Sequence, residues 1–212
     1  MSIKDQEFLY SVFRKEIKDR KIPLSLGKTC PVKCTFCYEM DHSYRKTFET
    51  PLTTQEHWEF IFKEIRSFPT RESESWILGG NEYMEWTDLA LHPKAMDWIE
   101  EFLEKTDKKI TMFSVGYFDP ARINRLAEKY PGRINFELSV ITLGSYREQL
   151  MPKGPSVKQV LAVLDGPAVT SANFYSFGPG SMSEDAKKIS DINKDCLLWM
   201  GCLTPLKYID AD

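Results

Sequence analysis

Several features that define large protein classes are missing from this sequence. No apolar run of about 18 residues occurs, so we expect no transmembrane helix, and residues 1–21 lack the continuous apolar segment of a secretory signal. The formal net charge of −3 gives no reason to expect a broad basic surface for nucleic acid. No Gly/Ser-rich linker or low-complexity tract interrupts the 212 residues, so we predict one domain that spans residues 1–212.

Cysteine is also scarce, and it is unevenly distributed. The chain has five cysteines, and three of them, Cys30, Cys34 and Cys37, lie on one short segment. This distribution does not fit a disulfide scaffold and favours a reducing, cytoplasmic location. The spacing is C-x3-C-x2-C, and three thiolates on one loop can hold three irons of a 4Fe–4S cluster. The fourth iron then has no protein ligand and is open to a small molecule, so the spacing predicts an enzyme rather than an electron carrier.

A structural zinc site is the alternative for three close cysteines. Such a site normally has four ligands, and the fourth would have to be His42, His57, Cys196 or Cys202, none of which stands at a familiar zinc-finger spacing. The C-x2-C-x2-C-x3-C run of bacterial ferredoxins is absent. We therefore favour a cluster with one open iron on this loop.

Residues 29–38 resemble the cluster-binding loop of the radical S-adenosylmethionine (radical SAM) superfamily, in which an aromatic residue precedes the third cysteine. Phe36 occupies that position. The resemblance implies that S-adenosylmethionine (SAM) chelates the open iron and is cleaved to methionine and a 5′-deoxyadenosyl radical, which takes hydrogen from a substrate. It also implies an electron donor such as flavodoxin or ferredoxin as a partner, and an anaerobic or oxygen-guarded setting.

Strand and helix patterns alternate along the chain. Apolar residues at helical spacing predict a first helix within an N-terminal extension, residues 1–21, and the expected cluster loop covers residues 28–40. Short apolar segments bounded by turn residues predict strands at residues 22–26, 75–78, 109–115, 133–141, 169–177 and 196–200. Helical patterns separate them. This order predicts an α/β fold with parallel strands, and the resemblance implies a partial (β/α)6 TIM-like barrel.

The loop after the second predicted strand carries candidate SAM contacts. Gly79 and Gly80 stand first, and glycine lets the backbone approach a ligand closely. In the superfamily a Gly-Gly-Glu motif at this place receives the SAM amino group. This sequence departs from the motif, because Asn81 stands where glutamate is usual and Glu82 follows one place later. Either Asn81 accepts the ammonium or a shifted turn presents Glu82, and we favour Asn81 with help from the backbone.

Further candidates belong to the other strand ends. Ser114 lies near the carboxyl end of the third predicted strand, and alternation places Glu137 and Ser139 on one face of the fourth. Polar groups in the mouth of a barrel usually bind something, and the resemblance implies that Ser139 binds the SAM ribose and that Tyr38 contacts the adenine. Arg147 either pairs with the methionyl carboxylate, which suits its planar fork, or lies on a solvated helix face.

Two other functions fit the same residues. One is an iron–sulfur or zinc module that binds a partner and does no chemistry, and the other is the catalytic core of a longer enzyme. Of the two cysteines outside the loop, Cys196 begins an apolar strand, and we expect it to be buried. Cys202 follows that strand and is a candidate hydrogen-atom donor.

Overall fold

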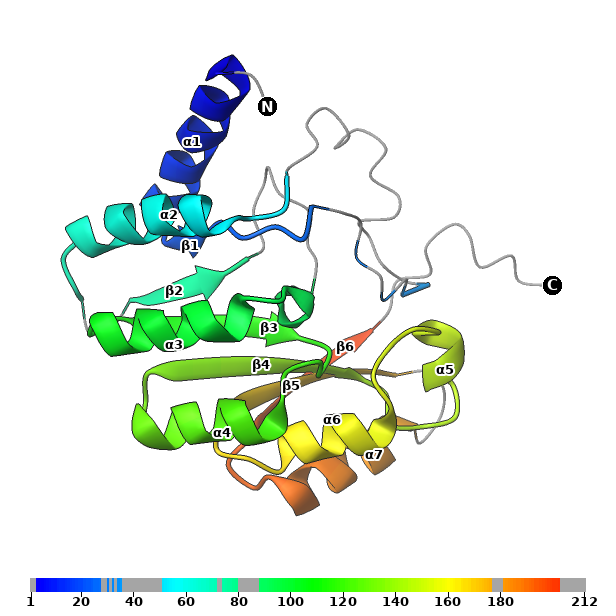
Figure 1. Ribbon diagram of the computed structural model, residues 1–212. Coiled ribbons are helices and arrows are strands. Elements are labelled where there is room, and N and C mark those ends of the chain that lie inside the picture. The colour runs from blue at the N-terminus through cyan, green and yellow to red at the C-terminus, as the bar shows by residue number, and fades with distance from the viewer. Residues whose placement is uncertain are drawn as a thin grey trace.

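Parallel strands in a single sheet form the framework of the protein (Figure 1). The computed structural model describes residues 3–27, 30, 32, 34, 35, 51–71, 74–79, 88–176 and 181–202. The strands are β1 (Lys21–Ile22), β2 (Ser75–Leu78), β3 (Lys109–Ser114), β4 (Ile134–Ile141), β5 (Val169–Ser176) and β6 (Leu197–Cys202). The helices of these residues are α1 (Ile3–Lys18), α2 (Gln55–Ser67), η3 (Leu89–Leu91), α3 (Ala95–Lys105), α4 (Pro120–Lys129), α5 (Arg147–Leu150), α6 (Val157–Leu164) and α7 (Ser181–Ile192).

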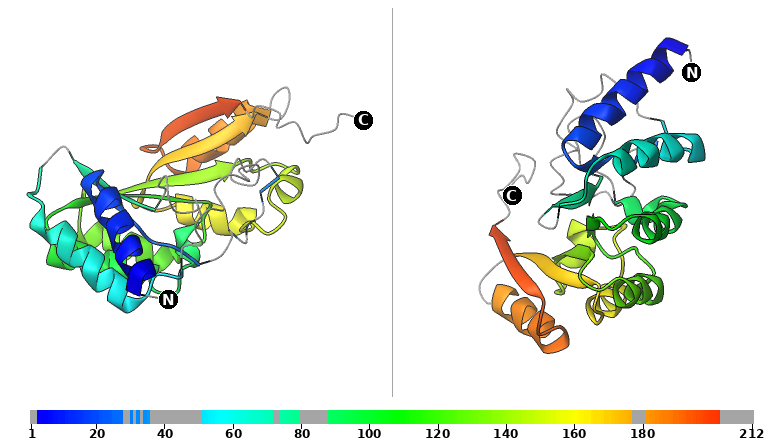
Figure 2. Two further views of the ribbon diagram at one scale, coloured as in Figure 1. Left: turned by 90° about the horizontal axis from the view of Figure 1, so that it is seen from above. Right: turned by 90° about the vertical axis from the view of Figure 1, so that its left-hand side faces the viewer.

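The strands lie in the sheet in the order in which they occur along the chain, and every neighbouring pair is parallel. Crossovers of one hand between such neighbours place their helices on one face. Figures 1 and 2 show α2, α3, α4 and α6 side by side over one face, with α7 beyond α6. Among the described residues β1 pairs only with β2 and β6 only with β5, so the sheet is open. The predicted α/β fold with parallel strands is confirmed.

Alternation along the strands separates the two faces of the sheet. On β4, Phe136 and Leu138 are fully buried and share one hydrophobic core with the helices, whereas Glu137 and Ser139 point to the other side and are only half-buried. We call this other side of β3–β6, over which no described helix packs, the open face. The residues of this face whose side chains the structure describes are, in register, Thr111, Phe113, Asn135, Glu137, Ser139, Ser171, Asn173, Leu197 and Trp199, with Lys109 placed by alternation along β3.

The first strand is shorter than the segment 22–26 that the sequence predicts. Pro23 has no backbone N–H to donate to a strand ladder, and pairing with β2 ends at Ile22. Ser25 instead exchanges hydrogen bonds with Thr53: its N–H donates to the Thr53 hydroxyl at 2.8 Å, and its carbonyl accepts the Thr53 N–H at 3.1 Å. The chain that enters the cysteine loop is therefore fixed to the residues before α2.

Two short elements, η3 and α5, are not predicted from the sequence. They contain three and four residues, which is too short for a helical period to be recognised. Both lie between a strand and the next long helix, and both supply residues to the site described below. None of the described helices is long and apolar enough to cross a membrane.

Candidate functional site

The cysteine loop lies near the carboxyl ends of the strands, the edge at which parallel α/β folds carry their binding sites. Val32 is buried against Ile141, the last residue of β4, and against Met151. Cys30 and Cys34 pack against this small apolar cluster, and both are partly exposed. Two of the three predicted cluster ligands therefore lie together at the strand ends.

Residues from three different connections brace the loop. The N–H of Thr35 donates to the carbonyl of Leu150, the last residue of α5, at 2.9 Å. Leu91 of η3 packs against the same apolar cluster, as do Val115 and Tyr117 after β3. Segments that follow β2, β3 and β4 thus hold the described part of the cysteine loop in place.

Arg147 is buried at the start of α5, with only 3% of its surface exposed. Its Nε donates to the Pro155 carbonyl at 3.1 Å, and its Nη1 donates to the carbonyls of Val140 and Thr142. Nη2 has no hydrogen-bond partner among the described residues. Burial lowers the pKa of Arg147, and the nearby Cys34 acts in the opposite direction. The side chain is therefore not on a solvated helix face, and one of its donor groups remains unused within electrostatic reach of Cys34.

The end of β4 has an irregular backbone. Ile141 has a φ of 66°, a left-handed conformation that β-branched residues rarely adopt. The pairing with β5 shifts register between Ser139 and Ile141. Just beyond, the Thr142 hydroxyl donates to the buried carboxylate of Asp185 in α7 at 2.7 Å. Contacts from α5 and α7 thus hold a strained strand end in place, and strain of this kind concentrates at functional sites.

A second buried charge holds the end of β3. The Asp88 carboxylate accepts hydrogen bonds from the Ser114 hydroxyl at 2.9 Å, the Val115 N–H at 2.8 Å and the Ala90 N–H at 3.0 Å. Burial raises the pKa of Asp88 to about 6, although these bonds act to lower it. Ser114, a predicted SAM contact, donates its hydroxyl hydrogen to Asp88, and its oxygen accepts the Gly116 N–H at 3.0 Å. Its hydroxyl therefore fixes the turn after β3.

Gly79, directly after β2, is at a position that requires glycine. Its φ is +75°, and a Cβ atom there would lie 2.4 Å from Cδ1 of Leu89. The backbone at Gly79 therefore passes close to the side chain of Leu89. The remaining predicted ligands and contacts lie outside the described residues: Cys37, Tyr38, Gly80, Asn81 and Glu82.

Glu137 and Ser139 share the open face, as alternation predicts. Ser139 pairs in register with Asn173 of β5 and lies two residues before the end of β4. Burial raises the pKa of Glu137, and a hydrogen bond with Asn173 acts to lower it. Ser139 is thus the residue of this pair nearer to the cysteine loop, and Glu137 lies further along the face.

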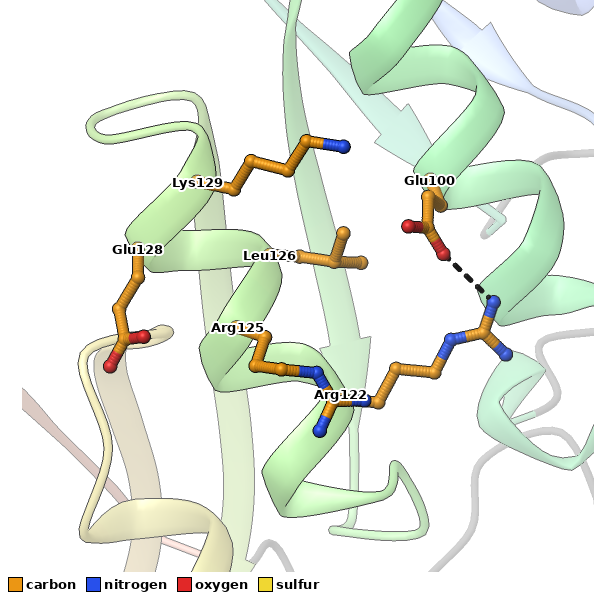
Figure 3. Close-up of a pocket in the computed structure, with 6 residues that line it drawn as sticks. All are labelled: Glu100, Arg122, Arg125, Leu126, Glu128 and Lys129. Carbon is orange, nitrogen blue, oxygen red and sulfur yellow. Dashed lines mark hydrogen bonds and ion pairs between the residues drawn. The ribbon is translucent and has the colours of Figure 1, made fainter.

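A surface groove between α3 and α4 lies apart from these residues (Figure 3). Its lining residues are Glu100, Arg122, Arg125, Leu126, Glu128 and Lys129. Arg122 donates to Glu100 at 3.0 Å and to Asp97 at 2.7 Å. Solvated ion pairs of this kind contribute only about 0.2–1 kcal/mol each, and none of the predicted site residues lines the groove, so we assign it no function.

The thiol of Cys196 is buried as predicted, and burial raises its pKa to about 11, which makes it unreactive. Within the part of the chain that the structure describes, no three His, Cys, Asp or Glu side chains gather into a metal site; Cys37 lies outside that part. No family model matches the chain, and no curated protein matches it.

Proposed function

We propose that this protein is a radical SAM enzyme. The observation that carries the proposal is the position of Cys30 and Cys34, two thiols of a C-x3-C-x2-C loop, at the carboxyl ends of parallel strands. A structural metal site needs a closed ligand set and no particular place in the fold. A loop with only three ligands at the ligand-binding edge of a sheet suits an enzyme whose small-molecule cofactor completes the site.

The topology supports the same function. The strands are parallel and lie in chain order, and their helices pack on one face of the sheet; this is the arrangement from which (β/α) barrels are built. Six strands, five of them followed by a described helix, are compatible with the partial (β/α)6 TIM-like barrel that the resemblance implies. On this proposal the open face is the barrel interior, where substrate would bind.

The residues at the edge suit an anionic iron–sulfur group. Cys30 and Cys34 would supply two thiolates and Cys37 the third, which makes the bound cluster negatively charged. Arg147 offers a buried positive charge whose Nη2 has no partner among the described residues. An anionic group at this edge would give that donor a partner and would offset the cost of burying the guanidinium.

When bound, the cluster and SAM supply the electron transfer and the 5′-deoxyadenosyl radical that takes hydrogen from a substrate. The chain binds and positions these groups. Gly79 makes room for the Leu89 side chain beside the end of β2, and Asp88 and Ser114 fix the end of β3. The apolar cluster around Val32 keeps water from the buried side of the thiols, and Ser139 remains the candidate for the SAM ribose.

Anaerobic reconstitution with iron and sulfide tests this function. We expect about four irons per chain and an absorption and EPR spectrum that changes when SAM is added. Cys30→Ala, Cys34→Ala and Cys37→Ala should each lose the cluster. Cys196→Ala is the matched control, because it removes a buried thiol just before the amino end of β6 and should leave the cluster intact.

Stoichiometric zinc in place of iron would contradict the proposed function. A complete cluster whose spectrum does not respond to SAM would instead favour an iron–sulfur module without SAM chemistry. Retention of iron by all three loop variants would remove the loop from the metal site altogether.

A further inference from the structure

Among the open-face residues that the structure describes, only Glu137 carries a carboxylate. Phe113 of β3 lies beside it in register, and Asn173 of β5 hydrogen-bonds to it from the other side. Lys109 is the only cation among the residues of this face, and it lies at the amino end of β3, four residues before Phe113. Glu137 therefore forms no ion pair with any described residue of the open face.

Two large apolar side chains lie on the same face at β6. Leu197 and Trp199 are 57% and 55% exposed. Leu197 pairs with Ser171, which pairs with Glu137, and Trp199 lies two residues further toward the carboxyl edge. Two strand spacings of about 4.8 Å separate β6 from β4, so the apolar side chains lie roughly 10 Å from the carboxylate. A molecule of moderate length can contact both.

We infer that the open face binds an organic ammonium ion, with its cation at the Glu137 carboxylate and an attached flat apolar group on Leu197 and Trp199. A carboxylate beside the aromatic ring of Phe113 suits an ammonium group through charge-assisted hydrogen bonding and cation–π attraction. The same charge disfavours anionic ligands. Glu137 lies four residues, roughly 13 Å of strand, before Ile141, so this site is separate from the strand end at which the cysteines pack.

The environment of Glu137 agrees with a cationic ligand. Burial raises the pKa of its carboxyl group, and a bound cation favours the ionised form and so offsets the burial. A role for the bound amine as the substrate that gives up hydrogen would rest on the proposed function. The binding face itself does not depend on SAM chemistry.

Calorimetry on the full chain tests the inference with three probes of similar shape: phenethylamine, 2-phenylethanol and phenylacetate. We expect phenethylamine to bind at least about tenfold more tightly than the uncharged and the anionic probe, the size of effect that one charge-assisted contact produces. Glu137→Gln should abolish this preference. Glu128→Gln, on the exposed face of α4, is the matched control and should keep it, and circular dichroism checks that both variants fold.

The affinity for phenethylamine should also fall as the pH is lowered, because protonation of Glu137 removes the charge that binds the cation. The fall should begin above the pH at which an ordinary glutamate titrates, since burial raises this pKa, and 2-phenylethanol should show no such change. Equal affinities for the three probes, or a preference that survives Glu137→Gln, would overturn the inference. A stable dimer that Trp199→Asp separates would overturn it as well, since a second copy would then cover the face.

The response of the wild-type cluster spectrum to SAM is measured separately, so that the two ideas can fail independently. If the cluster spectrum responds to SAM but the protein shows no preference for the amine, the proposed function is supported and the amine site is rejected. If the protein prefers the amine but its cluster spectrum does not respond to SAM, the amine site is supported and the proposed function is rejected.

Discussion

Arg147 donates to three backbone carbonyls around the end of β4 while almost fully buried. Methionine keeps much of its volume but leaves these carbonyls without their donors, and each unpaired buried polar group costs about 1–3 kcal/mol. We expect Arg147→Met to lower the free energy of unfolding in urea by about 3–5 kcal/mol. Arg125→Met, on the surface of α4, should change it by less than about 0.5 kcal/mol. Similar stabilities for the two variants would show that the guanidinium does not support the strand end.

Asp88 should make stability depend on pH. Its pKa is raised to about 6 in the folded protein, so between about pH 4 and 6 the folded state binds more protons than the unfolded chain does. The wild type should therefore lose stability relative to Asp88→Asn as the pH rises through this range. The total loss in the free energy of unfolding should be at most on the order of 3 kcal/mol. Above about pH 6 the difference between the two proteins should no longer change with pH.

Urea unfolding of both proteins at several pH values gives the difference directly. A difference that does not change with pH, or that changes in the opposite direction, would mean that Asp88 is ionised without penalty in the folded protein.

The positions of individual site residues could be predicted from the sequence to different degrees. Cys30 and Cys34 follow a predicted strand, so their place near the strand ends could be predicted. The buried position of Arg147 could not, because it depends on a left-handed turn at Ile141 that no glycine marks. The role of Asp88 could not be predicted either. Its hydrogen-bond donors come from β3 and η3, which only the folded chain brings together.

At the scale of elements, the carboxyl end of β2 has a steric requirement at Gly79. Gly79 and Gly132 have similar positive φ values of +75° and +70°, but a Cβ at Gly79 would meet Leu89 at 2.4 Å, whereas one at Gly132 would meet nothing within 4 Å. Gly132→Ala should therefore lower the free energy of unfolding only by the cost of holding alanine in a left-handed backbone conformation, about 1–2 kcal/mol. Gly79→Ala should cost measurably more in the same urea experiment. Equal losses would mean that Leu89 moves aside freely.

The alternation of strands and helices could be predicted because each buried strand is a short apolar run with turn residues on both sides. The five strands β2–β6 lie where the sequence predicts them, within about two residues. The first strand ends early because Pro23 cannot donate to the ladder. Bulges such as the one at the end of β4 could not be predicted, since they arise from the fit of one strand against the next.

At the scale of the whole molecule, an open parallel sheet has one face, at β3–β6, over which none of the described helices packs. The residues of that face are mixed in polarity rather than uniformly apolar, with Glu137 near its middle and Trp199 at its edge. A face of this kind is too polar for a simple packing surface and suits a ligand with a charged and an apolar part. The cysteine loop packs at the carboxyl end of β4, roughly 13 Å of strand from Glu137, so the ligand site and the proposed cofactor site are distinct.

The central claim is that this chain cleaves SAM reductively. The most direct test is mass spectrometry for 5′-deoxyadenosine after the reconstituted protein has been reduced with dithionite in the presence of SAM. We predict 5′-deoxyadenosine and methionine from the wild type and from Cys196→Ala, and neither from Cys34→Ala. Wild-type protein with a complete cluster and no 5′-deoxyadenosine would contradict the claim.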